Sequence, residues 1–300
     1  MANIGHPENG AAVLDYHLHL WPHGERDRQP TVEQLAEFCA AAEAHGVVEI
    51  ALTEHLFRFG QADAICRGFW EEDPDGDLAR EMAAYWDAHA HADLDCYVDT
   101  VVAAKQAGLP VILGLEVDYY RGRMDKVAAL LDGYPFDVLL GSVHWIGAWG
   151  FDDLDSQVVM AEWDRRDIEV VWDAYTEALE ELASSGACDV LAHPDLVKIC
   201  GRYPRVPEEF YDRMASAAAA SGMAAELSSA GWRKPVGEQY PAPALLERLV
   251  RQGVGLTTAS DSHGVSNVGQ RSVDLRAILS GAGVVELTGF RERTPYPVVL

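Results

Sequence analysis

Seven short runs rich in valine, isoleucine and leucine recur along this chain of 300 residues, and alanine- and glutamate-rich segments separate them. In order, the runs read AVLDYHLHL, VVEIALTEH, PVILGLEVDY, FDVLLGSVHW, CDVLAHPD, MAAELSSAG and VGLTTASDSH. Such runs are typical of buried strands, whereas segments such as TVEQLAEFCAAAEAHG and APALLERLVRQG are typical of helices, several of them stopped by glycine. Buried strands that alternate with helices form a parallel sheet. Seven such units predict an α/β fold with a closed or nearly closed barrel; a doubly wound open sheet is the alternative.

The chain is expected to form one domain over residues 1–300, because no linker rich in proline, glycine or serine divides it and no internal repeat is present. Residues 57–95 interrupt the rhythm of strands and helices and include FWEEDPDGDLAREMAAYWDAHAHADLD. We expect this insertion to contain helix and to cover one mouth of the barrel, because long insertions after a strand often shape substrate pockets. A surface excursion with no role in the site is the alternative.

The formal net charge of −25 disfavours binding to nucleic-acid polymers and to anionic membranes, because both are negatively charged. An anionic substrate would then need local positive charge, which bound divalent cations supply. The sequence has no apolar run long enough for a membrane span and no secretory signal pattern at its start. The five scattered cysteines include no CxxC pair and are typical of reduced thiols. We therefore expect a cytoplasmic protein; the sequence leaves its oligomeric state open.

Seven of the eleven histidines lie at the C-terminal ends of the predicted strands, together with carboxylates. The nine side chains that could bind metal there are His17, His19, His23, His55, Glu116, His144, His193, Asp261 and His263. In a parallel barrel these ends share one face, which is the face that carries the active site. Imidazole and carboxylate bind zinc, manganese and iron, and an ion with an open position takes about three protein ligands. The nine residues therefore predict two to three divalent transition-metal ions.

Other polar residues have a simpler interpretation. A lone histidine is more often a core or surface residue than a ligand, and we expect this for the remaining four, His6, His45, His89 and His91. Asp118 and Glu226 are interpreted either as hydrogen-bond partners of ligands or as residues of the barrel rim.

The ordered motifs HLH, TEH, GLEVDY, GSVHW, AHPDL, ELSSAGWRKP and SDSH resemble those of the PHP metal-dependent phosphoesterases from about Asp15 to Phe290. GLEVDYYRG, FDVLLGSVHW and SAGWRKP resemble the histidinol-phosphatase branch in particular. The resemblance implies a distorted TIM-like (β/α)7 barrel with a trinuclear centre of zinc, manganese or iron. It also implies that the nine residues named above are the metal ligands, with Glu116 as a bridging carboxylate. Two departures from the motifs are Glu54, where Asp is common, and Ser228, where the branch usually has Asn.

The activity implied by the resemblance is hydrolysis of a small phosphate monoester by a metal-activated hydroxide. In this branch the reaction is L-histidinol phosphate to L-histidinol and phosphate, in histidine biosynthesis. Asp261 or His263 would orient the nucleophile or protonate the leaving alkoxide. We expect Arg233 and Lys234 to bind the phosphate, with a solvated loop pair as the alternative. Glu54, or an acidic residue of the insertion, is expected to meet the ammonium group of such a substrate.

Three other functions are alternatives. The first is a PHP-family phosphatase that acts on another small phosphoester, such as a nucleoside bisphosphate. The second is a metal-storing or regulatory module, which would be expected to lack some ligands, although none is missing from the sequence. The third is a metal-dependent amidohydrolase, which would usually have a lysine at a strand end, and no predicted strand end has one.

Overall fold

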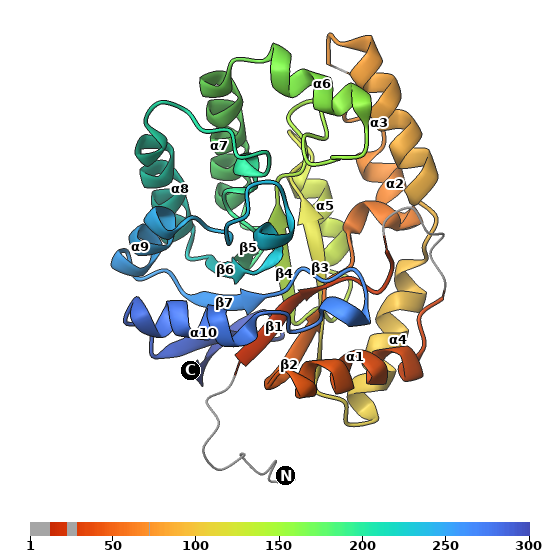
Figure 1. Cartoon of the computed structure of the whole chain (residues 1–300). Coiled ribbons are helices and arrows are strands. Elements are labelled where there is room, and N and C mark those ends of the chain that lie inside the picture. The colour runs from red at the N-terminus through yellow and green to blue at the C-terminus, as the bar shows by residue number, and fades with distance from the viewer. Residues whose placement is uncertain (1–12, 23–28, 72) are drawn as a thin grey trace.

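A sheet of seven parallel strands forms the centre of the computed structural model, which describes residues 13–22, 29–71 and 73–300 (Figure 1). The strands pair in chain order and are β1 (Val13–Leu18), β2 (Val47–Leu52), β3 (Val111–Asp118), β4 (Val138–Ser142), β5 (Val190–Leu191), β6 (Ala224–Ser228) and β7 (Leu256–Ala259). All of them except β2 are buried along their whole length. A doubly wound sheet would reverse its strand order at a switch point. The predicted barrel is therefore confirmed, and the open-sheet alternative is wrong.

The first and last strands of this sheet approach each other and nearly close the barrel. The amide of His19 donates a hydrogen bond to the Ser262 carbonyl (2.8 Å) just beyond the ends of β1 and β7. The buried Asp15 carboxylate accepts hydrogen bonds from the amides of Ser260 (2.7 Å) and Gly269 (2.8 Å). One carboxylate of β1 thus fixes the segment that carries the last sequence motif, SDSH.

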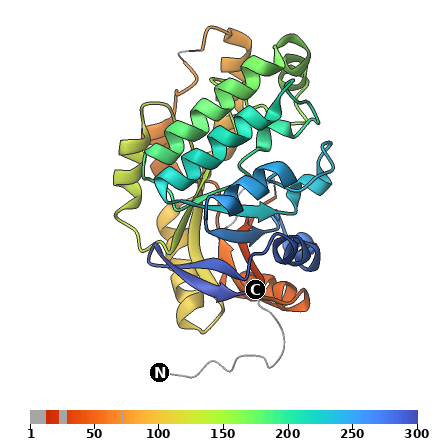
Figure 2. The same cartoon turned by 90° about the vertical axis from the view of Figure 1, so that its left-hand side faces the viewer.

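Helices cover the outside of the barrel (Figures 1 and 2). Those that connect successive strands include α1 (Val32–Ala44), α4 (Leu94–Gln106), α5 (Met124–Leu131), α7 (Ile168–Ser184), α8 (Pro207–Ser221) and α9 (Pro243–Arg251), and α10 (Ser272–Gly281) follows β7. Their ends follow local chemistry: the Asp167 carboxylate accepts from the Glu169 amide (2.9 Å) at the start of α7. Gly222, with φ 75°, ends α8 in the left-handed conformation that glycine adopts readily. Among the described residues, no helix has both the length and the apolar character that crossing a membrane requires.

The predicted insertion contains the short 3-10 helix η1 (Leu56–Arg58), α2 (Gly60–Cys66) and α3 (Gly76–His89). Trp86 on α3 is fully buried, and its indole donates a hydrogen bond to the Asp63 carboxylate of α2 (2.6 Å). Phe57 packs against Trp145, which follows β4, with ring centroids 5.9 Å apart. The insertion therefore packs against the barrel through aromatic side chains. In Figure 1, α3 lies beside α6 (Gln157–Arg165) at the upper end of the molecule.

A two-stranded antiparallel hairpin, β8 (Glu286–Arg291) and β9 (Thr294–Val299), was not predicted from the sequence. It lies at the lower end of the molecule in Figure 2. Its turn reaches residues just before β4 and β5: the Arg293 amide donates to the Asp137 carbonyl (2.8 Å), and its guanidinium pairs with Asp189 (2.9 Å). The hairpin thus covers the N-terminal ends of barrel strands, opposite the strand ends that carry the histidines.

Candidate metal centre

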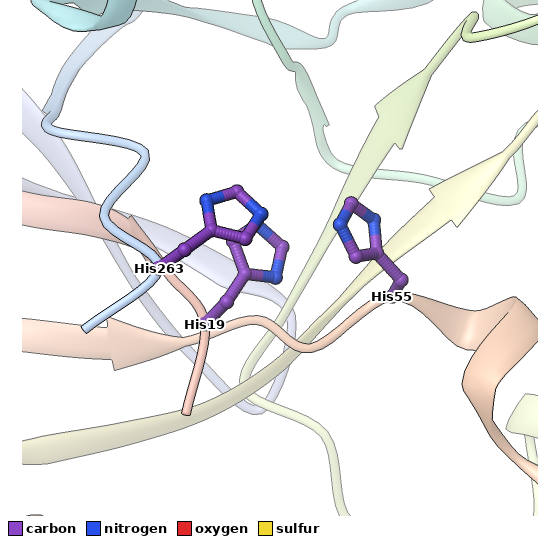
Figure 3. A group of neighbouring side chains, drawn as sticks. All are labelled: His19, His55 and His263. Atoms are coloured by element: carbon purple, nitrogen blue, oxygen red, sulfur yellow. The ribbon is translucent and has the colours of Figure 1, made fainter. Parts of the chain in front are cut away.

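Eight of the nine predicted metal ligands meet at the C-terminal mouth of the barrel. The ninth, His23, lies outside the described residues. Figure 3 shows three of the eight, His19, His55 and His263, which come from three separate segments and gather in one place. The His19 ring lies 4.1 Å from the His55 ring and 4.2 Å from the His263 ring, measured between centroids. The parallel arrangement of the strands therefore brings together residues that the sequence separates by more than 240 positions.

The Glu116 carboxylate, which is fully buried, lies between five imidazoles. Its Oε2 lies 2.6 Å from His55 Nδ1, 3.3 Å from His17 Nε2 and 3.6 Å from His19 Nε2. Its Oε1 lies 3.0 Å from His193 Nε2 and 3.3 Å from His144 Nε2. The two oxygens thus face different sets of histidines, which is the arrangement that a carboxylate bridging two ions requires.

Four overlapping groups of side chains each bring three potential ligand atoms within 4.8 Å of one another. The groups are His19–His55–His263, His17–His193–Glu226, His17–His19–Asp261 and His55–Glu116–His144. Every one of these residues is buried except Asp261 and His263, which are partly exposed. Three potential protein ligands per group match the number that an ion with an open coordination position takes.

Carboxylates behind the imidazoles fix their orientation. Glu226 Oε2 lies 2.9 Å from His17 Nδ1, and Asp118 Oδ1 lies 2.5 Å from His144 Nδ1. A carboxylate at Nδ1 accepts a hydrogen bond from the Nδ1–H, which keeps the ring proton on that nitrogen and leaves the Nε2 lone pair free for a metal. Asp118 and Glu226 are therefore confirmed as hydrogen-bond partners of predicted ligands.

The pKa values of the cluster residues reflect both burial and the close approach of oppositely charged groups. Burial opposes ionisation of Glu116, but His17, His144 and His55 hold the pKa of its carboxyl well below the usual value. Burial likewise disfavours the imidazolium of His17, yet Glu226, Glu116 and Asp261 raise its pKa well above the usual value. The carboxylates thus hold positive charge in the site. Bound cations would supply that charge in place of the imidazole protons.

Several buried nitrogen atoms of the cluster have no hydrogen-bond partner in the structure, among them His17 Nε2 and His19 Nε2. Unpaired buried polar atoms are costly and rare, so a group of them that points to one place indicates a missing partner. Imidazole nitrogens and carboxylate oxygens are the donor atoms that zinc, manganese and iron accept. The residues present therefore fit divalent transition metals.

The backbone is strained at two of the predicted ligands. His193 (φ 26°) and Asp261 (φ 51°) are non-glycine residues with positive φ. The structure around them holds this conformation: the His193 amide donates to Glu226 Oε1 (2.8 Å), and the Arg233 guanidinium donates to the carbonyls of Ser260 (2.7 Å) and Asp261 (2.9 Å). Strained residues of this kind cluster at functional sites.

A cavity of about 550 Å³ opens above the cluster. Its lining includes predicted ligands, residues of the insertion and residues of the loop after β4. Arg233 and Lys234, the predicted phosphate-binding residues, lie on its wall. Glu54 is not among the lining residues: it accepts hydrogen bonds from the amides of Leu20 and Trp21, and its second oxygen lies 3.7 Å from His19 Nδ1. Glu54 therefore fixes the loop after β1 through the amides of Leu20 and Trp21 and does not reach the cavity.

Comparisons with known proteins agree with this geometry. The sequence model of the PHP domain matches residues 17–230. The chain belongs to the PHP domain family. A Deinococcus radiodurans protein named "Probable histidinol-phosphatase" is 36% identical over 205 residues, which are 67% of this chain and 76% of that protein. A Schizosaccharomyces pombe protein of the same name is 26% identical over 59% of this chain and 61% of its own.

A solved structure resembles the whole fold. It is the histidinol phosphate phosphatase of Lactococcus lactis subsp. lactis, complexed with zinc, L-histidinol and phosphate. It superposes with a TM-score of 0.71 at 21% identity, covering 96% of this chain and 100% of that chain. The seven-stranded barrel is therefore a PHP barrel.

Some residues of the PHP cavity were not found from the sequence. His89 was expected to be a core or surface residue rather than a ligand; it belongs to none of the four groups of potential ligands, and it lines the cavity from α3 with its ring stacked on Tyr85 at 4.1 Å. Tyr240 and Asp152 also line it. The Tyr240 hydroxyl is buried with no hydrogen-bond partner in the structure. No strand-end pattern marks these residues, because they come from a helix of the insertion and from loops.

Proposed function

We propose that this PHP protein hydrolyses L-histidinol phosphate to L-histidinol and phosphate. The observation that carries the proposal is the Glu116 carboxylate between five imidazoles, at the floor of a cavity large enough for a small phosphate ester. Two PHP relatives are named as histidinol phosphatases, and a protein with the same fold was solved with L-histidinol and phosphate bound. The chain is accordingly a metal-dependent phosphatase.

The metal centre takes two to three divalent ions of zinc, manganese or iron. The described residues that would hold them are His17, His19, His55, Glu116, His144, His193, Asp261 and His263. When bound, such ions lower the pKa of a water molecule and neutralise charge on a phosphate. Glu226 and Asp118 hold the imidazoles of His17 and His144 in the tautomer that metal binding needs.

The remaining steps are assigned to side chains on the cavity wall. Arg233 and Lys234 bind the phosphate oxygens, because both lie on the cavity wall, Arg233 beside Asp261, and bring positive charge to an acidic protein. Asp261 and His263, which are 15% and 23% exposed at the side chain, are the most exposed of the predicted ligands that line the cavity. One of them orients the attacking water or protonates the leaving alkoxide.

The protein acts on a small molecule in the cytoplasm. The net charge of −25 repels nucleic-acid polymers. All five cysteines are free thiols, which is the state that the reducing cytoplasm maintains.

The test uses the full chain, stripped of metal and then reloaded with zinc or manganese. We expect elemental analysis to find more than one ion per chain and L-histidinol phosphate to be hydrolysed faster than a nucleoside bisphosphate or p-nitrophenyl phosphate. His17→Ala and Asp261→Ala should abolish turnover while the far-ultraviolet circular dichroism stays unchanged. Trace metal only, or faster turnover of another ester, would contradict the proposal.

A further inference from the structure

Asp152, in the loop between β4 and α6, is a carboxylate on the cavity wall that the metal centre does not use. The other carboxylates near it are committed: Asp153 accepts from the amides of Asp155 and Ser156, and Glu81 accepts from the Ser156 hydroxyl (2.7 Å). No other residue among the described ranges donates a hydrogen bond to the Asp152 side chain or forms an ion pair with it. The carboxylate therefore lies on the cavity wall without a hydrogen-bond donor or ion-pair partner from any other described residue.

The Asp152 carboxyl interacts electrostatically with residues of the metal centre and of the cavity wall. Burial raises the pKa of its carboxyl, and His144, Lys234 and His193 act electrostatically in the opposite direction. Asp152, His144, His193 and Lys234 all line the same cavity. Lys234 does not come within salt-bridge distance of it in the structure, although both line the cavity. A partly desolvated carboxylate in this position favours a cationic partner.

An aromatic wall lines the same cavity as Asp152. Its members are Phe57, Tyr85, His89 and Trp145. Phe57 contacts both Tyr85 (5.6 Å between centroids) and Trp145 (5.9 Å). Aromatic faces pack against flat heteroaromatic rings and attract cations. The cavity thus offers three kinds of contact: a metal cluster for a phosphate, an aromatic surface for a ring and a separate carboxylate for a cation.

We propose that Asp152 binds the ammonium group of the substrate and is the residue that selects amino-alcohol phosphates over other phosphate monoesters. This inference rests on the proposed function. In L-histidinol phosphate the ammonium-bearing carbon is joined directly to the CH₂–O of the phosphate ester. An ester whose phosphate lies on the cluster therefore carries its ammonium only a few bonds away, within the cavity that Asp152 lines together with His144 and His193. Asp152 repels anionic esters that lack an ammonium, so it selects by repulsion as well as attraction.

The contacts or the exposure of the other carboxylates exclude them from this role. Glu116 is surrounded by imidazoles, and Asp118 and Glu226 are each bonded to one. Glu54 lies outside the cavity lining and is bonded to backbone amides. Asp155 lines the cavity but is exposed at its rim, where water weakens its attraction for a cation.

The test compares L-histidinol phosphate with 3-(imidazol-4-yl)propyl phosphate, which has the same ring and ester but no amine. The wild-type enzyme should prefer the amine-bearing ester by about 10–100-fold in kcat/KM, the range expected for a hydrogen bond to a charged group. Asp152→Asn should abolish this preference by lowering kcat/KM for L-histidinol phosphate only. The matched control is Asp155→Asn, which removes the same charge from the rim and should change the preference by no more than about threefold.

Each result has one meaning. If the wild-type enzyme hydrolyses both esters equally well, or if Asp152→Asn keeps the preference, the role of Asp152 is wrong while the proposed function stands. A uniform loss on both esters also overturns it, because that would place Asp152 in the fold or in the metal centre. If the wild-type enzyme does not hydrolyse L-histidinol phosphate at all, the proposed function itself fails. The comparison of the two esters with the wild-type enzyme needs no variant. It can therefore overturn the role of Asp152 even if Asp152→Asn does not fold.

Discussion

Glu226→Gln is the substitution that tests most directly how the barrel prepares its histidines for metal. Glu226 is fully buried and uses both oxygens: Oε2 lies 2.9 Å from His17 Nδ1, and Oε1 accepts the His193 amide at 2.8 Å. Glutamine has the same shape, but one oxygen becomes an NH₂ group that can only donate. The substitution therefore changes the hydrogen bonding at one of the two contacts and leaves the packing intact.

The two orientations of the amide have different costs. With its NH₂ towards His17, the amide forces the ring proton onto Nε2, which then cannot bind metal; loss of such an orienting partner lowers metal affinity about 10–100-fold, or about 1.4–2.7 kcal/mol. With its NH₂ towards His193, the amide leaves a buried backbone donor without an acceptor, which destabilises the fold by about 1–3 kcal/mol. The variant must lose either metal affinity or stability.

Two measurements on the same samples distinguish these outcomes. Titration of metal-free protein with zinc against a chromogenic chelator reports affinity, and thermal unfolding of the metal-free protein reports stability. Glu177→Gln is the control, because Glu177 is 54% exposed and lies away from the cavity lining. Unchanged zinc affinity together with an unchanged unfolding temperature in Glu226→Gln would refute the assignment of Glu226 as the residue that orients His17.

Two further predictions concern stability. Removal of metal by a chelator should lower the unfolding temperature and addition of zinc or manganese should restore it, because an ion bound only to the folded state stabilises that state; scanning calorimetry checks this, and equal temperatures with and without metal would contradict it. Asp137→Asn should lower the unfolding temperature by about 2–6 °C, because the buried carboxylate accepts from Lys105 Nζ (2.5 Å), the Leu113 amide (2.9 Å) and the Glu292 amide (3.2 Å). Metal-loaded Asp137→Asn should keep its kcat, since Asp137 precedes β4 at the end of the barrel opposite the cluster, and a large loss of kcat without unfolding would show that the two ends are coupled.

The strand order and the position of the metal cluster were predictable because both follow from local pattern. Buried apolar runs alternate with helices, and parallel strands bring their C-terminal ends to one face. The β8–β9 hairpin was not predictable in the same way. Its turn residues, Glu292 (φ 46°) and Arg293 (φ 60°), adopt the left-handed conformation that Asn and Gly usually mark in such turns. Contacts with Asp137 and Asp189 hold the turn, and these partners are distant in sequence.

The residues around the substrate cavity depend on tertiary structure in the same way. His89 lies on a helix of the insertion, and Asp152 lies in a loop, so neither carries the strand-end signal that marks the ligands. Glu54 follows a strand, as a ligand would, but the neighbouring β1 loop presents the amides of Leu20 and Trp21 to it. The sequence pattern identifies which groups gather at the mouth, whereas the direction of each side chain depends on the segments that pack beside it.

The near-closure of the barrel between β1 and β7 has a consequence for the order in which parts of the protein unfold. The group His17–His19–Asp261 draws its atoms from both sides of that junction, so one ion would act as a removable cross-link between segments some 245 residues apart. A cross-link across a loop of that length restricts the unfolded chain by about 5 kcal/mol in the entropic account used for disulfides. Loss of metal should therefore open this junction before the rest of the barrel. The amides of His19, Ser260 and Gly269 would then exchange with solvent earlier than those in β3 and β4.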